Sequence, residues 1–205
     1  MRFVVMITGA SGTIYALRLL KFLRELGHYT ETIISRESYE VSDSECMDKE
    51  SFLAFLKNTS DKIYEEHMLS APLSSSSYLA IFDGFIVIPC SINTLAKAAH
   101  GIADNLINRV IANALRLRKK IIFVIRETPL GVIELRNALI LARAGAYILP
   151  ASPGFYQNPR DALDLVDFVV GKVLDLLEVK HDVYKRWTGS STGRDLCRHV
   201  FSRDL

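Results

Sequence analysis

Short apolar runs alternate with helix-like segments, and this alternation constrains the fold most strongly. The runs at Phe3–Ile7, Gly84–Pro89 ("GFIVIP") and Ile121–Ile125 ("IIFVI") are almost wholly apolar. Strands of this kind are buried on both faces. Between the first two runs, the segment Tyr15–Leu26 places leucines three residues apart, as an amphipathic helix does. The pattern predicts an α/β protein with a parallel sheet and helices on both faces.

The predicted elements follow one another over most of the 205 residues. Strands are expected at Phe3–Ile7, Tyr29–Ser35, Lys62–Glu66, Gly84–Pro89, Ile121–Ile125 and Ala146–Leu149. Helices are expected at Tyr15–Leu26, Ser42–Lys57, Ile133–Ala144 and Ala162–Leu177, with one or two more over Thr94–Arg118, broken near Gly101. Ser70–Ser77 is expected to be a loop. We expect a single three-layer domain over residues 1–187 and a polar tail over residues 188–205.

Composition disfavours several classes of function. A net charge of +2 argues against a nucleic-acid partner. The three cysteines are far apart and lack a C-x-x-C spacing, which favours a reduced, cytoplasmic setting and no metal site. No apolar run approaches the ~18 residues of a membrane span, and the first strand begins at once, so neither a membrane anchor nor a signal peptide is expected.

The loop after the first strand has the composition of a phosphate cradle. It reads T-G-A-S-G, from Thr8 to Gly12, and leads directly into a helix. Backbone N–H groups and the dipole at a helix start attract anions, and glycines let an anion approach. The spacing is not G-x-G-x-x-G, so the dinucleotide fingerprint is absent, and a tight turn without a ligand stays open. A short-chain dehydrogenase is disfavoured because no tyrosine has a lysine four residues later.

Two further loops follow strands at the edge where such sheets bind ligands. Ser35 and Arg36 end the second strand, a pair that suits phosphate or a flavin edge better than a ribose diol. Glu45, alone on a polar helix, suggests a solvated surface group. Ser91 is a candidate helix cap, and with Thr94 it is also a candidate ligand group. Cys90 is expected to be a small buried residue.

A fourth loop carries charge at the tip of an apolar strand. Arg126 and Glu127 follow the strand Ile121–Ile125 and precede Pro129. Their position suits a site, although a surface ion pair would have the same sequence. Further on, "PASPGFY" predicts a rigid turn that presents Phe155 and Tyr156.

These motifs together carry a resemblance. The chain holds T-G-A-S-G, C-S-x-x-T-L, N-L-I-x-R, R-E-x-P and P-A-x-P-G-F-Y in this order, at Thr8–Gly12, Cys90–Leu95, Asn105–Arg109, Arg126–Pro129 and Pro150–Tyr156. Over roughly residues 2–187 it resembles the flavin prenyltransferases of the UbiX/Pad family. No single motif is decisive, but five in sequence are specific.

The resemblance implies a flavodoxin-like (Rossmann-like) doubly wound fold that binds FMN. It implies transfer of a dimethylallyl group from dimethylallyl monophosphate to N5 and C6 of the reduced flavin, without a metal. The prenylated FMN would serve a decarboxylase of the UbiD type. Members assemble as dodecamers with active sites between subunits, so a homo-oligomer is expected.

The resemblance also assigns residues. FMN would be bound by Gly9, Ala10, Ser11, Ser35, Ser91, Ile92, Asn93, Thr94 and Arg126. The prenyl phosphate would be bound by Arg109, Arg116, Tyr156 and Lys172. Ser11 and Glu45 would form a relay around N5, Glu127 would be the acid/base at the C6 side, and Trp187 would stabilise the allyl cation.

Three positions depart from the family pattern. Arg116 stands where lysine is frequent, and Lys172 stands where some members have arginine. Ser76 stands at a family glycine, where its extra Cβ would close the pocket or alter donor choice. Monophosphate and diphosphate donors therefore both stay open.

Two other functions of the same fold are alternatives. A flavin-dependent cysteine decarboxylase needs a catalytic histidine and a P-A-S-A-N-T-like motif. This chain has no histidine between His28 and His67, and it reads P-C-S-I-N-T, so that function is disfavoured. A flavin carrier without chemistry stays open.

Overall fold

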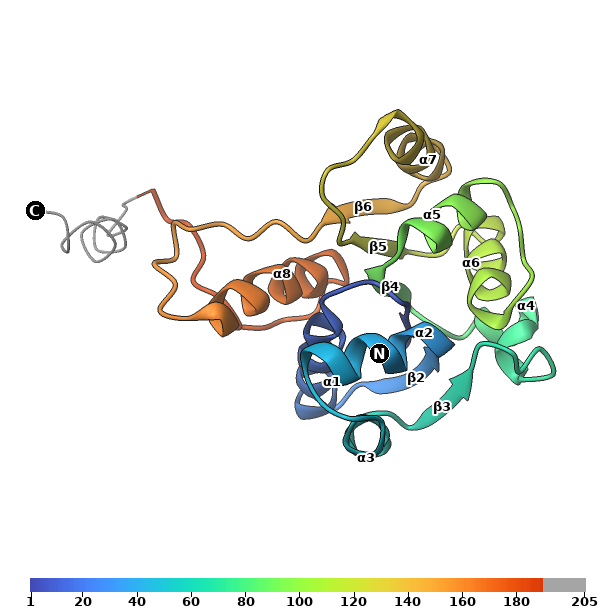
Figure 1. Cartoon of the computed structure of the whole chain (residues 1–205), viewed down its shortest axis with the longest axis horizontal. Coiled ribbons are helices and arrows are strands. Elements are labelled where there is room, and N and C mark those ends of the chain that lie inside the picture. The colour runs from blue at the N-terminus through green and yellow to red at the C-terminus, as the bar shows by residue number, and fades with distance from the viewer. Residues whose placement is uncertain (190–205) are drawn as a thin grey trace, which may run out of the picture. The chain divides into compact units, whose positions relative to one another are not determined.

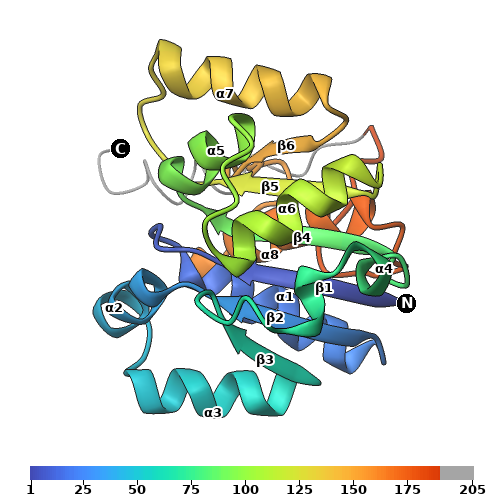
Figure 2. The same cartoon turned by 90° about the vertical axis from the view of Figure 1, so that its right-hand side faces the viewer.

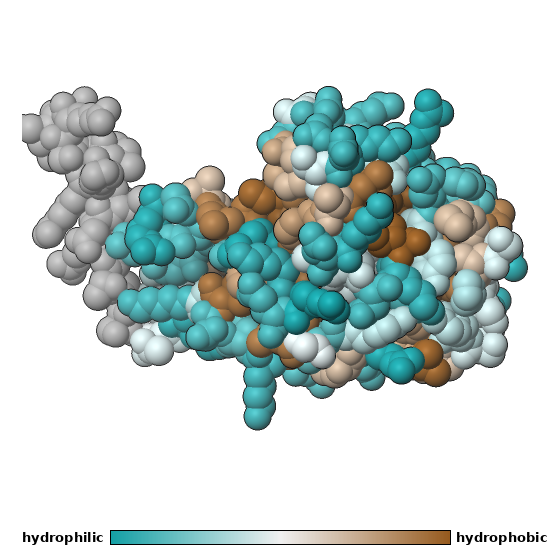
Figure 3. All heavy atoms as spheres, turned by 90° about the horizontal axis from the view of Figure 1, so that it is seen from below, coloured by the Kyte–Doolittle hydropathy of each residue, from teal (hydrophilic) through white to brown (hydrophobic). Residues whose placement is uncertain are grey.

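The computed structural model describes residues 1–189, which fall into two compact units, Met1–Ala151 and the chain from Ser152 onward (Figure 1). Residues 190–205, with Cys197 and most of the predicted tail, lie outside the described residues, and the predicted boundary at residue 187 stays a prediction. On the face drawn in Figure 3, polar side chains surround scattered apolar ones. Among the helices of residues 1–189, none is long and apolar enough to cross a membrane.

The first unit is built on a six-stranded sheet. Its strands are β1 (Arg2–Ile7), β2 (Tyr29–Ile34), β3 (Lys62–Glu65), β4 (Gly84–Cys90), β5 (Ile121–Ile125) and β6 (Tyr147–Pro150). All neighbours pair in parallel, in the order β3-β2-β1-β4-β5-β6. This is the Rossmann order of doubly wound sheets, which confirms the predicted architecture. The order reverses between β1 and β4, so a ligand crevice is expected where these two strands end.

Helices cover both faces of this sheet. They are α1 (Thr13–Glu25), α2 (Arg36–Glu45), α3 (Lys49–Thr59), α4 (Ser76–Leu79), α5 (Ile92–Ala99), α6 (Leu106–Arg116) and α7 (Val132–Arg143). Figures 1 and 2 place α1 and α6 on opposite faces. Successive side chains of β1 point to opposite faces of the sheet. On the face covered by α6, Val4 and Met6 belong to the buried cluster that includes Val110 and Ile111. The predicted break near Gly101 is confirmed by the separation of α5 from α6.

Two sequence predictions of secondary structure were wrong. The helix expected over Ser42–Lys57 is instead the end of α2 and most of α3. The chain breaks there because Asp48 caps α3: its carboxylate accepts a hydrogen bond from Ser51 N at 2.9 Å. The loop expected over Ser70–Ser77 contains a 3₁₀ turn, Pro72–Ser74, and the start of α4.

The second unit is organised around α8 (Ala162–Leu176) and an aromatic cluster. The Phe168 ring packs edge-on against Tyr184 and Tyr156, with ring centroids 5.2 and 5.6 Å apart. Tyr156 in turn meets Trp187 at 5.6 Å. Each such pair contributes about 0.5–1.5 kcal/mol beyond burial. The cluster therefore ties the turn before α8 to the segment that follows it.

A buried threonine joins the two strands at which the sheet order reverses. Thr8, directly after β1, donates its hydroxyl to Pro89 O of β4 at 2.7 Å. The same Oγ1 accepts a hydrogen bond from Ser91 N at 2.8 Å. Because Thr8 is almost fully buried, water cannot replace either bond. The Thr8 hydroxyl thus fixes the distance between the loop after β1 and the loop after β4.

We expect Thr8→Val to lower the free energy of unfolding by about 1–3 kcal/mol, because the buried Pro89 carbonyl and Ser91 amide lose their partner. Urea unfolding followed by circular dichroism measures the loss. Thr8→Ser keeps the hydroxyl and is the matched control, with a smaller loss from the missing methyl group. Equal losses in the two variants would contradict this role.

Candidate functional site

The loop after β1 is held open by backbone geometry and a carboxylate. Gly12 has φ +96°, a left-handed conformation that favours glycine. Its N–H donates to Glu45 Oε2 at 2.7 Å. Glu45 is exposed, as its lone position on a polar helix suggested, yet its carboxylate reaches this loop. A side chain at Gly9 would collide with Glu37, so α2 also requires a glycine there.

The charged loop after β5 meets the same turn. Arg126 Nε donates to Ser11 O at 3.2 Å, across 115 residues of sequence. Its neighbour Glu127 is exposed and accepts a hydrogen bond from Thr128 N at 3.0 Å. The arginine thus lies beside the serine-bearing turn. No ion pair joins Arg126 to Glu127 among the contacts of the described residues.

The loop after β4 combines a helix cap with buried groups. Ser91 Oγ accepts a hydrogen bond from Thr94 N at 3.2 Å, so Ser91 is the N-cap of α5, as the sequence suggested. The thiol of Cys90 is fully buried, and this burial raises its pKa. Such a thiol stays protonated and is a poor nucleophile, which agrees with its predicted packing role.

A cleft of about 340 Å³ opens at the carboxyl ends of β1, β2 and β4. Five of the predicted FMN residues line it: Gly9, Ser35, Ser91, Asn93 and Thr94. Ser35 is the N-cap residue of α2, but its side chain makes no capping hydrogen bond, and its buried Oγ has no hydrogen-bond partner. The buried Oδ1 of Asn108, another lining residue, also lacks a partner. We call this the switch-point cleft; its two unpartnered polar atoms are suited to a polar ligand.

The remaining FMN candidates lie around this cleft without lining it. Ala10 is buried in the loop after β1. In the same loop, Ser11 O accepts the hydrogen bond from Arg126 Nε. Ile92 is the first residue of α5. Sequence reasoning missed other lining residues, notably Thr8, Glu66 and Asn108. Asn105 caps α6 through Asn108 N at 2.9 Å and donates to Glu66 Oε2 at 2.6 Å. The signal available in the sequence was an asparagine immediately before an amphipathic helix.

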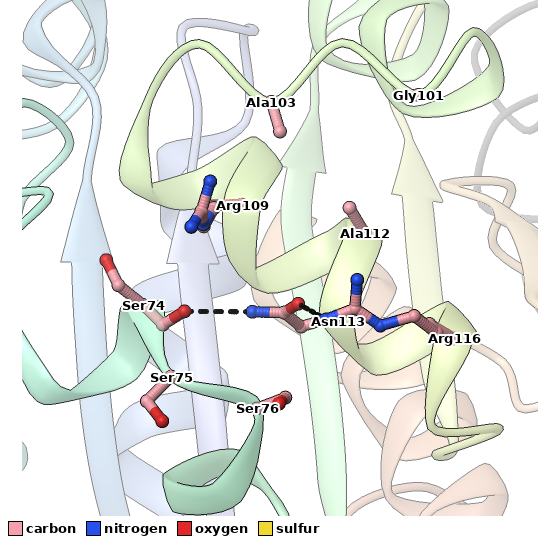
Figure 4. A pocket seen from close by; sticks show the side chains of 9 residues that line it. All are labelled: Ser74, Ser75, Ser76, Gly101, Ala103, Arg109, Ala112, Asn113 and Arg116. Atoms are coloured by element: carbon pink, nitrogen blue, oxygen red, sulfur yellow. Dashed lines mark hydrogen bonds between the residues drawn. The ribbon is translucent and has the colours of Figure 1, made fainter.

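Two predicted phosphate residues share a second hollow, shown in Figure 4. Arg109 and Arg116, both exposed on α6, line a pocket of about 490 Å³ together with Ser74, Ser75 and Ser76. We call it the arginine pocket. Ser76 lies in the wall of this pocket, and the expected effect of its extra Cβ on closure or donor choice stays a prediction.

The predicted residues Tyr156, Lys172 and Trp187 lie in the second unit, where Lys172 belongs to a hydrogen-bond network around Asp175. Lys172 Nζ donates to Tyr184 Oη at 2.9 Å, and Tyr184 donates to Asp175 Oδ2 at 2.6 Å. Arg186 and His181 contact the other oxygen of Asp175, at 2.6 and 3.0 Å. The hydrogen bond to Tyr184 raises the pKa of Lys172, which keeps the ammonium charged. Tyr156 and Trp187 pack ring to ring in the same unit.

Comparison with known proteins identifies the family. The Flavoprotein family model matches residues 1–183. The flavin prenyltransferase UbiX of Saccharolobus solfataricus is 50% identical over 188 residues, 92% of each chain. That of Aquifex aeolicus is 44% identical, over 89% of this chain and 96% of its own. The chain belongs to the flavin prenyltransferase UbiX family.

Solved structures agree with this membership. AnUbiX (PadA1), in a crystal structure with FMN and dimethylallyl pyrophosphate, is 36% identical with a TM-score of 0.87, covering 93% of this chain and 98% of its own. A dodecameric FMN-dependent Ubix-like decarboxylase from Escherichia coli O157:H7 is 34% identical with a TM-score of 0.86, covering 92% and 100%. The peptidyl-cysteine decarboxylase EpiD, 17% identical with a TM-score of 0.61, shares only the fold with this UbiX family member.

We expect Asp175→Asn to destabilise this UbiX family member in a pH-dependent way. Burial alone would raise the pKa of Asp175. The hydrogen bonds from Arg186, Tyr184 and His181 together lower it by more, so the net shift of the pKa is downward. A lowered folded-state pKa gives stability that is present above the unfolded value of about 3.9 and is lost as pH falls through the folded value.

Asp175→Asn should therefore lower the free energy of unfolding at pH 7 by about 1–3 kcal/mol. The difference from the unchanged protein should shrink steadily below about pH 4. Urea titrations across this range measure it, with Asp182→Asn, an exposed neighbour, as the control. A difference that stayed constant with pH would refute this role of the carboxylate.

Proposed function

We propose that the chain binds reduced FMN in the switch-point cleft and transfers to it a dimethylallyl group from dimethylallyl phosphate. The observation that carries the proposal is the convergence on one turn. Glu45 contacts Gly12 N and Arg126 contacts Ser11 O, beside a cleft lined by Ser35 and Ser91. Separate loops thus bring polar groups to the place where a doubly wound sheet binds nucleotides.

The residues present fit FMN. The first turn of α5 directs backbone N–H groups toward the cleft, and Ser91 and Thr94 add hydroxyls, a combination that suits the flavin phosphate. The unpartnered Ser35 Oγ and Asn108 Oδ1 would find partners on a polar ligand. When bound, the reduced flavin supplies the nucleophilic N5 and C6 atoms.

The donor phosphate suits the arginine pocket. Arg109 and Arg116 are exposed cations beside serine hydroxyls, and guanidinium groups bind phosphate by paired hydrogen bonds. The family resemblance adds Lys172 and Tyr156, which lie in the second unit, as further proposed phosphate ligands. Together these groups stabilise the charge that the leaving phosphate gains as the C–O bond breaks. Trp187 would stabilise the allyl cation by about 1–2 kcal/mol.

The proton transfers fall to the carboxylates. Glu127 is exposed next to Arg126 and is the proposed acid/base for the C6 side. Glu45, held on Gly12 N, and Ser11 would form the relay near N5. Each would hold or move a proton while Arg126 fixes the turn that carries Ser11.

The proposal also includes assembly of the chain into a homo-oligomer. On α7, apolar side chains are exposed, including Val132 at 64% and Ile133 at 69%. Helix faces of this kind are usually covered in an oligomer. The E. coli relative is dodecameric, and we propose a homo-oligomer of the same kind here. We also propose that the prenylated flavin passes to a UbiD-type decarboxylase in the cytoplasm.

Mass spectrometry of the bound flavin tests the reaction. The protein is incubated with reduced FMN and dimethylallyl monophosphate, and in a parallel arm with the diphosphate. A gain of one C5 unit supports the prenyltransferase, and the arm that gives it identifies the donor. Unchanged flavin with decarboxylation of a cysteine-ended peptide would instead support the cysteine decarboxylase. Unchanged flavin in all arms would indicate a carrier.

We expect Glu127→Gln to slow prenylation by about 10²–10⁴-fold, the contribution of a positioned acid/base. FMN affinity, measured by quenching of flavin fluorescence, should stay within twofold because the amide keeps the size of the side chain. Glu134→Gln, on α7, is the control. Prenylation by Glu127→Gln at the unchanged rate would remove Glu127 from this role.

A further inference from the structure

A buried asparagine links the two walls of the arginine pocket. Asn113 lies in the last turn of α6 and is only 4% exposed. Its Nδ2 donates to Ser74 O at 3.0 Å, across 39 residues of sequence. Its Oδ1 accepts a hydrogen bond from Arg116 Nη2 at 2.5 Å. Figure 4 shows the amide between the serine segment on one side and the guanidinium on the other.

This placement needs an explanation beyond helix packing. Asparagine is a weak helix former, and a buried amide is costly unless both of its ends are hydrogen-bonded. The neighbouring buried positions of α6, Val110, Ile111 and Ala114, are apolar. An apolar residue at 113 would leave Ser74 O and the Arg116 guanidinium without this link.

The link restricts one of the two cations of the pocket, Arg116. An arginine side chain loses much rotamer freedom when it binds an anion, unless that freedom has already been lost. Asn113 takes up one of the five N–H donors of Arg116 and leaves the others for a ligand. Because the same amide holds Ser74 O, the serine wall and the guanidinium keep a fixed spacing.

We propose that Asn113 is a positioning residue, which pre-organises Arg116 against the Ser74–Ser76 wall to receive the phosphate of the prenyl donor. The inference rests on the proposed function for the identity of that donor. The anion site itself is defined by the geometry of the pocket.

A double-mutant cycle tests the link with a readout that needs no turnover. Binding of inorganic pyrophosphate to the FMN-loaded protein is measured by calorimetry for Asn113→Leu, Arg116→Gln and the double variant. We expect Asn113→Leu to weaken binding about tenfold, as loss of a hydrogen bond to a charged group does. The double variant should bind no more weakly than Arg116→Gln alone, because Asn113 acts through Arg116.

Steady-state kinetics and FMN binding complete the test. Asn113→Leu should raise KM for the prenyl donor with a smaller change in kcat, and FMN affinity should stay within twofold. Arg118→Gln removes one charge from the turn after α6, outside the pocket, and is the matched control. If Asn113→Leu does not fold, Asn113→Ala enters the same cycle.

Two outcomes would overturn the proposal. Effects of Asn113→Leu and Arg116→Gln that multiply in the double variant would show that the residues act independently. A lower melting temperature with unchanged pyrophosphate affinity would show a purely structural role. Failure of the proposed function is recognised separately: the unchanged protein would form no prenylated flavin, whatever the cycle shows.

Discussion

The site depends on the hydroxyl of Thr8. The carboxyl ends of β1 and β4 would be neighbours in any sheet of this strand order, but nothing in the strand pairing sets the spacing of the loops beyond them. Thr8 Oγ1 sets it, with one bond to Pro89 O and one from Ser91 N. The loops on the two sides of the switch-point cleft are therefore both hydrogen-bonded to a single buried atom. Farther along the loop after β1, Glu45 binds Gly12 N and Arg126 binds Ser11 O.

The sequence predicted the fold well because the strands are buried on both faces. Phe3–Ile7 and Ile121–Ile125 are apolar throughout, which leaves a parallel sheet as the main solution. It failed over Ser42–Lys57, where propensity alone is neutral and the deciding fact is a local bond from Ser51 N to Asp48. Capping bonds of this kind determine where helices end, and a polar stretch offers many candidate caps.

The site was predictable where loops follow strands and unpredictable where partners are distant. Ser35, Ser91 and Arg126 could be named because strand ends meet at one edge. Glu45 is exposed, as its place on a polar helix predicted, but its contact with Gly12 N, 33 residues away, could not be predicted from spacing; only the family resemblance assigned Glu45 to the site. Asn108 was missed because the residues around it in the sequence do not indicate that its Oδ1 is buried without a hydrogen-bond partner. Such contacts depend on tertiary structure, which residue spacing does not encode.

Helix α6 ties the two proposed binding sites into one rigid body. Its N-cap, Asn105, and Asn108 of its first turn line the switch-point cleft. Arg109, Asn113 and Arg116, farther along the helix, line the arginine pocket. Since its apolar face is buried in the core, the helix cannot shift toward one site without disturbing the other. The flavin and the donor phosphate would thus both be positioned by the same helix, α6. In a transfer reaction between two bound molecules, such fixed geometry is a main source of rate enhancement.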